Sequence, residues 1–147
     1  MPKKIVIGII LIFFAITAYV YFNQKFYSYV EIKGYKFFVE LADTQFKQTQ
    51  GYSNHQPIKD NEGMLFVFSN NTERSFWMKD MLFPLDMIWI SDNKIINISR
   101  NLPPEGETPI NKYYSGQPSN YVLEINGGLS DKLGLKIGDK VKINLTR

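Results

Sequence analysis

Two carboxylates lie inside otherwise apolar runs of this sequence. Asp86 interrupts the run PLDMIWI at residues 84–90, and Glu124 interrupts YVLEI at residues 121–125. An unpaired carboxylate is costly to bury, or it takes up a proton, so each needs a partner or a solvated cleft. If the two lie together, they could act as the acid and the base of a small hydrolase. The sequence alone does not say whether they meet.

Asp86 has a structural interpretation as well as a functional one. A buried aspartate can accept hydrogen bonds from backbone N–H groups, or it can pair with Arg74, Lys79 or Arg100. The structural interpretation predicts that Asp86→Asn destabilises the domain. The functional interpretation predicts unchanged or higher stability, because site residues commonly cost stability.

The segment Phe76-Trp77-Met78-Lys79 is the second place where a site could form. A lysine after an aromatic pair could close a small-molecule pocket or bind an anionic group. Its stem could equally lie along the Trp77 ring with its ammonium group in water. Trp77 and Met78 are predicted to be core or pocket wall. The predicted pocket therefore consists of Trp77, Met78, Lys79, Asp86 and Glu124.

A long proline-rich stretch, Leu102 to Asn120, is predicted to form the rim of this pocket. Loops of this length are usually functional or mobile. Tyr113, Tyr114 and Tyr121 flank the prolines and could line a binding face for a glycan or an extended peptide. The alternative is a loop with surface tyrosines and no ligand.

The composition excludes several classes of site. The chain has no cysteine and one histidine, His55, so thiol nucleophiles, thiolate metal sites and multi-histidine sites are absent. His55 is expected to be an exposed loop residue without a function. Asp80, Asp86 and Glu124 lack the spacing of an EF-hand, and we expect neither a metal nor a cofactor. No G-x-S-x-G motif is present, and no catalytic residue is assigned.

The charge balance argues against nucleic acid as a partner. The net charge is +3, and Lys3 and Lys4 contribute two of the positive charges. From residue 23 onward, 15 basic residues face 14 acidic ones. Binding driven by a basic field is therefore not expected.

Residues 5–22 are predicted to form a transmembrane anchor. The run IVIGIILIFFAITAYVYF contains no charge, and a helix of this length would be roughly 27 Å long, close to the thickness of the bilayer core. Tyr19 and Tyr21 suit the headgroup interface. A cleaved signal peptide is the alternative, but a good small-x-small cleavage site is missing. We expect a basic segment at 1–4 in the cytoplasm, a tether at 23–28, and an extracytoplasmic domain at 29–147.

The rest of the chain predicts a small, mainly β domain. Strands are expected at 29–32 and 35–42 as a hairpin, and at 63–68, 75–78, 85–90, 94–99, 121–125 and 141–145. A short helix should run from a cap at Asp43-Thr44 to about Gln50, and Ser130 could cap a helical turn. Many short strands separated by turns favour a closed or nearly closed β-barrel-like domain, with α+β as the broader alternative.

Several segments in this order resemble the family called domain of unknown function 192, or uncharacterised protein family 0127. The matching segments are Glu40-Leu41-Ala42-Asp43-Thr44, Gly51, GMLFVF at 63–68, FWMK at 76–79, PLDMIWI at 84–90, YVLEI at 121–125 and Gly138-Asp139. The resemblance covers about residues 30–145. It implies a small, mostly β domain, often secreted or membrane-anchored, and it implies no established activity.

The sequence departs from the family pattern in two places. Gln48 to His55, QTQGYSNH, stands where the family usually has a basic R-x-R-G-L-M-x-R stretch. Asp80-Met81 stands where the family more often has Asn-Thr.

Three functions stay open: a binding module for a small molecule, glycan or peptide, an interaction partner of another envelope protein, and a small hydrolase. They are ranked in that order.

Overall fold

The computed structural model describes residues 12–13 and 27–146. Apart from Ile12 and Phe13, the anchor predicted at residues 5–22 lies outside the described residues, as do most of the predicted tether and the segment 1–4. Within the described ranges, no helix is both long enough and apolar enough to span a bilayer.

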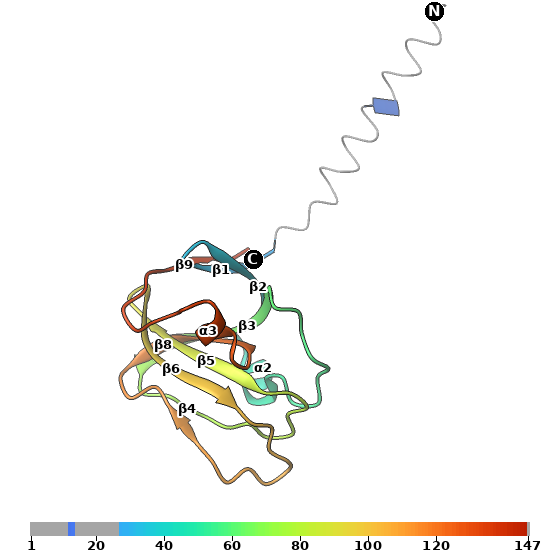
Figure 1. The fold of residues 1–147 in the computed structure, drawn as a ribbon, viewed down its shortest axis with the longest axis vertical. Helices are drawn as coiled ribbons and strands as arrows, with labels where there is room; N and C mark the ends of the chain where they lie inside the picture. The colour runs from blue at the N-terminus through green and yellow to red at the C-terminus, as the bar shows by residue number, and fades with distance from the viewer. Residues whose placement is uncertain (1–11, 14–26, 147) are drawn as a thin grey trace, which may run out of the picture.

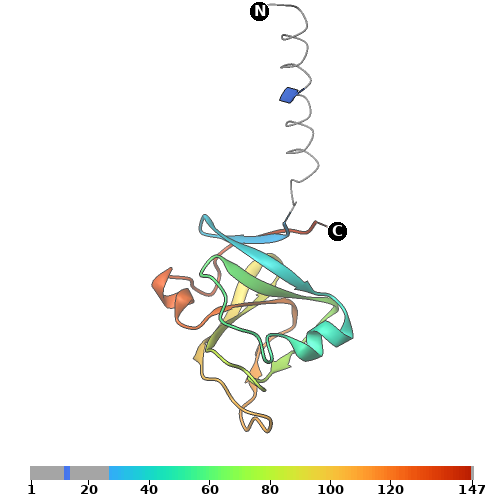
Figure 2. The same cartoon turned by 90° about the vertical axis from the view of Figure 1, so that its right-hand side faces the viewer.

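The domain is built on one seven-stranded sheet with the strand order β6-β5-β8-β3-β2-β1-β9 (Figures 1 and 2). A separate two-stranded sheet pairs β4 with β7. The strands are β1 Tyr29–Ile32, β2 Tyr35–Ala42, β3 Glu62–Thr72, β4 Ser75–Phe76, β5 Leu85–Ser91, β6 Lys94–Leu102, β7 Tyr113–Tyr114, β8 Ser119–Asn126 and β9 Val141–Asn144. Two short helices, α2 Gln45–Gln50 and α3 Leu129–Lys132, lie on opposite sides of the domain (Figure 2).

The first half of the sheet follows the local signals in the sequence. Strands β1 and β2 form the predicted antiparallel hairpin, with Lys33 and Gly34 at positive φ in its turn. Helix α2 then carries the chain across to β3, which runs parallel to β2. The Thr44 side chain caps α2 by accepting a hydrogen bond from the backbone N–H of Lys47, and Gly51 ends the helix.

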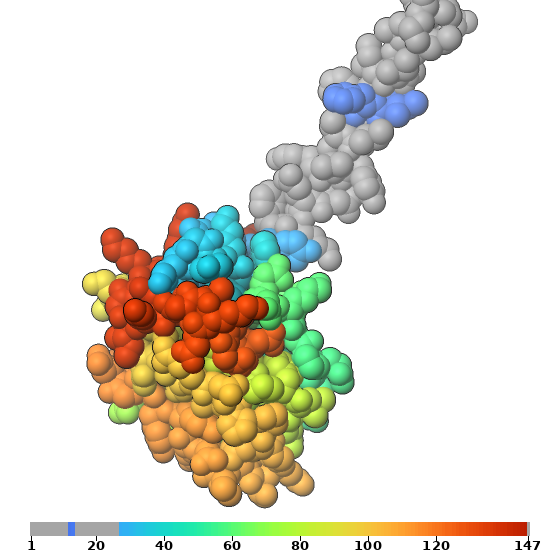
Figure 3. All heavy atoms as spheres, viewed as in Figure 1, coloured from blue at the N-terminus to red at the C-terminus, as the bar shows by residue number. Residues whose placement is uncertain are grey.

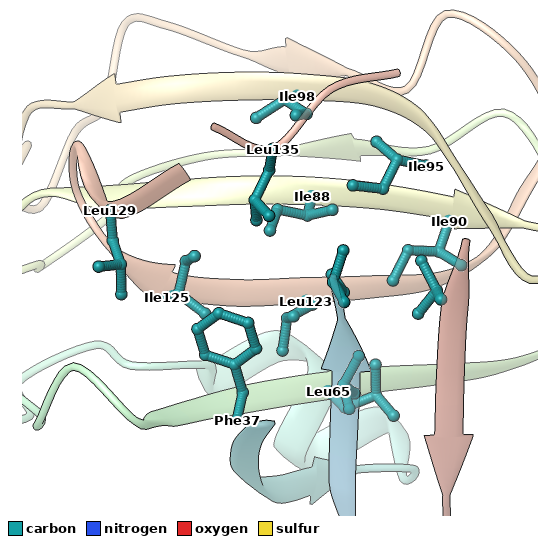
Figure 4. Packing of buried hydrophobic residues seen from close by; sticks show 13 residues of the cluster. Phe37, Leu65, Ile88, Ile90, Ile95, Ile98, Leu123, Ile125, Leu129 and Leu135 are labelled. Atoms are coloured by element: carbon teal, nitrogen blue, oxygen red, sulfur yellow. The ribbon is translucent and has the colours of Figure 1, made fainter. Parts of the chain in front are cut away.

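Strand β5 is buried at every position, because both faces of the sheet are covered around it. On one face, aliphatic side chains from most of the strands converge with Leu129 and Leu135, which come from α3 and the segment after it (Figure 4). Phe37, Leu65 and Leu123 lie in the same cluster. This face is the interior of the curved sheet.

The opposite face of β3, β8 and β5 carries a second core. Its members are buried strand residues together with side chains from the segments that cross over them, namely Ala42, Tyr52, Met64, Phe66, Met78, Met81, Phe83, Leu85, Met87, Trp89, Leu102 and Val122. Trp89 is fully buried and donates its indole N–H to the Ser99 hydroxyl at 3.1 Å. The central strands therefore have no solvent-facing side.

The two edges of the sheet approach each other at one end. An antiparallel bridge links Lys94 to Lys140, and the Ile95 N–H donates to the Asp139 carbonyl at 3.0 Å. Near the other end of β9, Ser28 joins the two ends of the domain, since its hydroxyl accepts the Thr146 N–H at 3.0 Å. The red C-terminal segment with α3 covers the surface below the blue β1–β2 hairpin (Figure 3).

The prediction of a mainly β domain with one or two short helices is confirmed. The sheet is a half-barrel whose edges are joined by a bridge rather than a full strand ladder, so the predicted barrel closure is met only in part. The strand expected at 75–78 is limited to Ser75–Phe76. The stretch 102–120 is shorter as a loop than expected, because β7 lies within it and β8 begins at Ser119.

Candidate functional site

Asp86 is fully buried in strand β5 and has backbone partners. Its Oδ1 accepts hydrogen bonds from the N–H groups of Asn101 at 2.6 Å and Gly128 at 2.8 Å. Its Oδ2 accepts one from the N–H of Ser130 at 2.7 Å. Three N–H donors can stabilise a carboxylate away from water, because hydrogen bonds to an ionised acceptor are the stronger kind.

These bonds make Asp86 the cap of helix α3. Gly128 is the N-cap residue of α3, and as a glycine it has no side chain that could cap the helix. The predicted cap, Ser130, lies inside the helix and is wrong as a cap, because a carboxylate from β5 occupies that role. Asp86 thus joins β5 to β6 through Asn101 and to α3, which is the structural interpretation of this residue.

Asp86 and Glu124 lie on opposite faces of the sheet. In the β5–β8 ladder Asp86 is paired with Ile125, and Glu124 is paired with Met87. Paired residues share a face and successive residues alternate, so the two carboxylates point in opposite directions. The hypothesis of an Asp86–Glu124 acid/base pair is therefore wrong.

Glu124 lies at the floor of a small recess in the outer face. The recess has a volume of about 30 Å³, enough for a group of the size of a water molecule. Its wall comes from the end of α2 and the residues after it, from β3, and from the segment 76–81, and it consists of Gln48, Thr49, Gln50, Gly51, Tyr52, Ser53, Phe66, Phe76, Trp77, Lys79 and Met81.

The carboxyl group of Glu124 has an unmet hydrogen-bonding need. Glu124 is 4 % exposed, and its Oε2 is buried without a hydrogen-bond partner among the described residues. A side chain at Gly51 would bring its Cβ to 4.0 Å from that oxygen and to 3.4 Å from the Phe66 ring. Gly51, at φ +50°, therefore leaves room beside the carboxyl group.

Burial dominates the electrostatics of this recess. Desolvation raises the pKa of Glu124 to about 8, so the carboxyl group holds its proton at neutral pH. Burial also raises the pKa of the Tyr52 phenol, and the nearby Glu124 adds to that effect. Lys79 does not neutralise Glu124, because its ammonium group donates to the Glu107 carbonyl at 2.7 Å and lies 3.5 Å from an Asp80 carboxylate oxygen.

A larger cleft of about 520 Å³ adjoins the recess. The two share Gln48, Thr49, Phe76 and Trp77 as lining residues. The cleft lies between α2 and the segment 73–77, and its other lining residues are Gln45, Phe68, Glu73, Arg74, Ser75 and Lys112. Trp77 is 46 % exposed there. An exposed indole beside amide side chains, with a carboxyl group below, offers both a stacking surface and hydrogen bonds to a small ligand.

The structure brings together only some of the predicted pocket residues. Trp77, Lys79 and Glu124 line the same recess. Met78 is fully buried in the outer core and lines neither the recess nor the cleft. Asp86 belongs to the inner face with α3, so its placement in the pocket is corrected.

The predicted tyrosine rim does not border this site. Tyr113 pairs with Phe76 in the small sheet and packs against the outer core, and Tyr121 packs against the inner core. Only Tyr114 is well exposed, and it lines neither cavity. His55 is half-buried rather than free in solvent, with its ring 5.5 Å from that of Tyr52. Among the described residues, no group of three or more His, Asp or Glu side chains could hold a metal ion.

Sequence reasoning missed the contribution of Gln48–Ser53 to the site. The stretch begins in the last turn of the polar helix α2 and continues beyond it, and no apolar periodicity marks Tyr52 as the buried wall that it is. The one signal was the departure from the family pattern in this stretch, which falls on the recess.

A family model for uncharacterised proteins, DUF192 ("Uncharacterized ACR"), matches residues 28–143. The chain belongs to the DUF192 family. It is similar to a crystal structure of a protein of unknown function from Novosphingobium aromaticivorans DSM 12444, with 38 % identity, a TM-score of 0.72, and coverage of 78 % of this chain and 83 % of that one.

A second similar crystal structure comes from Sinorhizobium meliloti 1021 and is described as that of a candidate transcription regulator. It has 33 % identity and a TM-score of 0.72, and the match covers 79 % of this chain and 92 % of that one. The comparison with curated proteins found no match. Membership of DUF192 therefore supports the β-rich fold and leaves the function to be argued from the site.

The contacts of Asp86 predict that Asp86→Asn destabilises the domain by about 3 kcal/mol, because an amide cannot accept all three N–H bonds and leaves a buried donor unsatisfied. Urea unfolding of the full chain measures this change. Asp131→Asn in α3 is the matched control, since the Asp131 carboxylate is largely exposed and its bond to Arg100 at 2.6 Å should be worth less than about 1 kcal/mol. Equal effects of the two variants would contradict the assigned role.

The burial of Glu124 predicts that stability falls as the pH rises. The unfolded carboxyl group loses its proton near pH 4.5, whereas the folded one keeps it until about pH 8. Stability should therefore decline between these values and level off above them. Glu124→Gln should remove the decline and raise the free energy of unfolding at pH 8 by roughly 2–4 kcal/mol.

Denaturant unfolding at pH 5 and pH 8 measures whether the free energy of unfolding falls as the pH rises. Glu107→Gln is the matched control, because Glu107 is exposed and its charge is solvated. A wild-type protein and a Glu124→Gln variant with parallel pH profiles would show that Glu124 ionises normally in the folded state.

Proposed function

We propose that this DUF192 protein is a binding module for a small ligand, and that the ligand binds in the cleft between α2 and the segment 73–77. The observation that carries the proposal is Glu124. A fully buried carboxyl group with an unpartnered oxygen costs stability, and nothing in the fold of the described residues uses that oxygen. Such a cost at the floor of a recess is typical of a binding site.

The lining of the cleft supports the same function. Trp77 presents an exposed indole next to Gln48 and Thr49, so one wall can stack and the neighbouring wall can form hydrogen bonds. The cleft volume of about 520 Å³ lies within the range of small-molecule sites. The nearly neutral charge after residue 23 argues against DNA as the ligand.

We also propose that residues 5–22 anchor the protein in the cytoplasmic membrane, with the domain on the extracytoplasmic side. The support is the uncharged run of 18 residues after Lys3 and Lys4. The domain then follows closely, since β1 begins at Tyr29. The cleft would face the cell envelope, where small solutes and cell-wall fragments are accessible.

Ligand binding is expected to perturb Trp77 and not Trp89. The chain has two tryptophans, and Trp89 is fully buried and hydrogen-bonded. Fluorescence of the full chain, titrated with a panel of amines, sugars and short peptides, should therefore reveal binding. Trp77→Ala should weaken the affinity of any bound compound at least tenfold by calorimetry, and it should lower the free energy of unfolding by no more than about 2 kcal/mol, because the indole is about half exposed.

Phe46→Ala is the matched control for Trp77→Ala. Phe46 lies on α2, is 77 % exposed, and does not line the cleft. It should leave the affinity unchanged. Absence of any response at Trp77 across the panel would contradict the small-ligand function and favour the alternative, an interaction partner of another envelope protein.

The proposed orientation predicts that protease added to intact spheroplasts cuts the domain. The basic N-terminal segment should stay protected, because the anchor keeps it inside. Immunoblots with tags placed before residue 3 and after residue 147 distinguish the two ends. A cytoplasmic protein that stays intact serves as the control for lysis, and complete protection of the domain would reverse the orientation.

A further inference from the structure

The aromatic side chains around Glu124 restrict what the recess can bind. Tyr52, Phe66, Phe76 and Trp77 all line it, with Glu124 at the floor. Aromatic rings attract cations through the negative charge of their faces, and a carboxylate attracts them more strongly. Rings grouped around a carboxyl group are typical of sites for positively charged nitrogen.

Within residues 27–146, no cationic side chain occupies this place. Among the lining residues, Lys79 is the only basic one, and its ammonium group is bound to the Glu107 carbonyl and lies near Asp80. The titratable side chains that line the recess with Glu124 are Lys79 and Tyr52, and Glu40 and Glu62 lie close enough to Tyr52 to help raise its pKa. Desolvation raises the pKa of Glu124, as expected when no positive charge among the described residues lies close enough to stabilise the carboxylate.

The size of the recess selects among cations. A volume of about 30 Å³ holds a group close to the size of a water molecule. A primary ammonium group fits this space, whereas a trimethylammonium group is several times larger. The rest of the ligand would lie in the adjoining cleft of about 520 Å³, with Trp77 between the two cavities as a shared wall.

We propose that the ligand is a small primary amine, whose ammonium group enters the recess and forms an ion pair with Glu124 while its body lies along Trp77. This inference rests on the proposed ligand-binding function and names the ligand class. The proton on the Glu124 carboxyl group leaves to solvent when the amine binds. The buried charge is then compensated by the ligand and not by the chain.

The experiment uses 2-phenylethylammonium as the probe, titrated into the full chain by calorimetry. The neutral isostere 2-phenylethanol, the anion 3-phenylpropanoate and the larger tetramethylammonium are the comparison compounds. The amine should bind more tightly than all three. Its association constant should rise about tenfold per pH unit from about pH 6 to about pH 8 and then level off, because the carboxyl group must lose its proton.

Proton release gives an independent readout. Titrations at pH 7 in two buffers of different ionisation enthalpy should show nearly one proton released per amine bound. Glu124→Gln should weaken binding at least tenfold and abolish both the pH dependence and the proton release. Glu107→Gln, at an exposed residue that lines neither the cleft nor the recess, should keep both signatures.

The comparison compounds separate the two proposals. If the alcohol or the carboxylate binds at Trp77 and the amine binds no better, the amine proposal is overturned and the binding function stands. If the amine binds without proton release, or binds equally well to Glu124→Gln, the ion pair with Glu124 is overturned. If no compound perturbs Trp77, both proposals fail.

Discussion

The central strands β5 and β8 are covered on both faces, and each carries a carboxyl group that water cannot reach. The rest of the structure depends on how these two buried carboxyl groups are stabilised. Strand β5 has no exposed position, and β8 is buried from Val122 to Ile125. Each of these strands nevertheless contains one carboxyl group. Water cannot solvate either group, so the protein has to provide partners or keep the group neutral.

The two carboxyl groups meet this constraint in different ways. Asp86 is satisfied by three backbone N–H groups, and those bonds position α3 and the end of β6 at Asn101. Its burial therefore contributes to the fold. No donor among the described residues reaches Oε2 of Glu124, and desolvation raises the pKa of this group so that it stays protonated at neutral pH. The cost of burying the Asp86 carboxylate is met by bonds that hold the fold together, whereas the fold does not explain why the Glu124 carboxyl group is buried. We therefore look for the function at Glu124.

The outer layer of the domain leaves a small recess above the Glu124 carboxyl group. The segments after α2 and around residues 76–83 cover the outer face of the sheet with aromatic side chains, and they meet above Glu124 with a gap of about 30 Å³. Gln48, Thr49 and Gln50 of α2 line the recess with uncharged side chains. Among the described residues, α2 therefore gives Glu124 no charged partner, and the recess holds a carboxyl group with an unpartnered oxygen.

The sequence by itself determined the β-rich fold, every strand of the seven-stranded sheet, the α2 helix with its Thr44 cap, and the family, because these depend on local propensity and on matched motifs. It missed β7, which lies in the stretch expected to be a loop. It also identified Asp86 and Glu124 as unusual residues, since a charged residue within an apolar run can be recognised from the sequence alone. Only the tertiary structure decided that they lie on opposite faces, because the face that each side chain occupies depends on the register between the two paired strands. Their partners were equally hidden: the donors to Asp86 are backbone groups 15 to 44 residues away, and the wall above Glu124 comes from three separate segments.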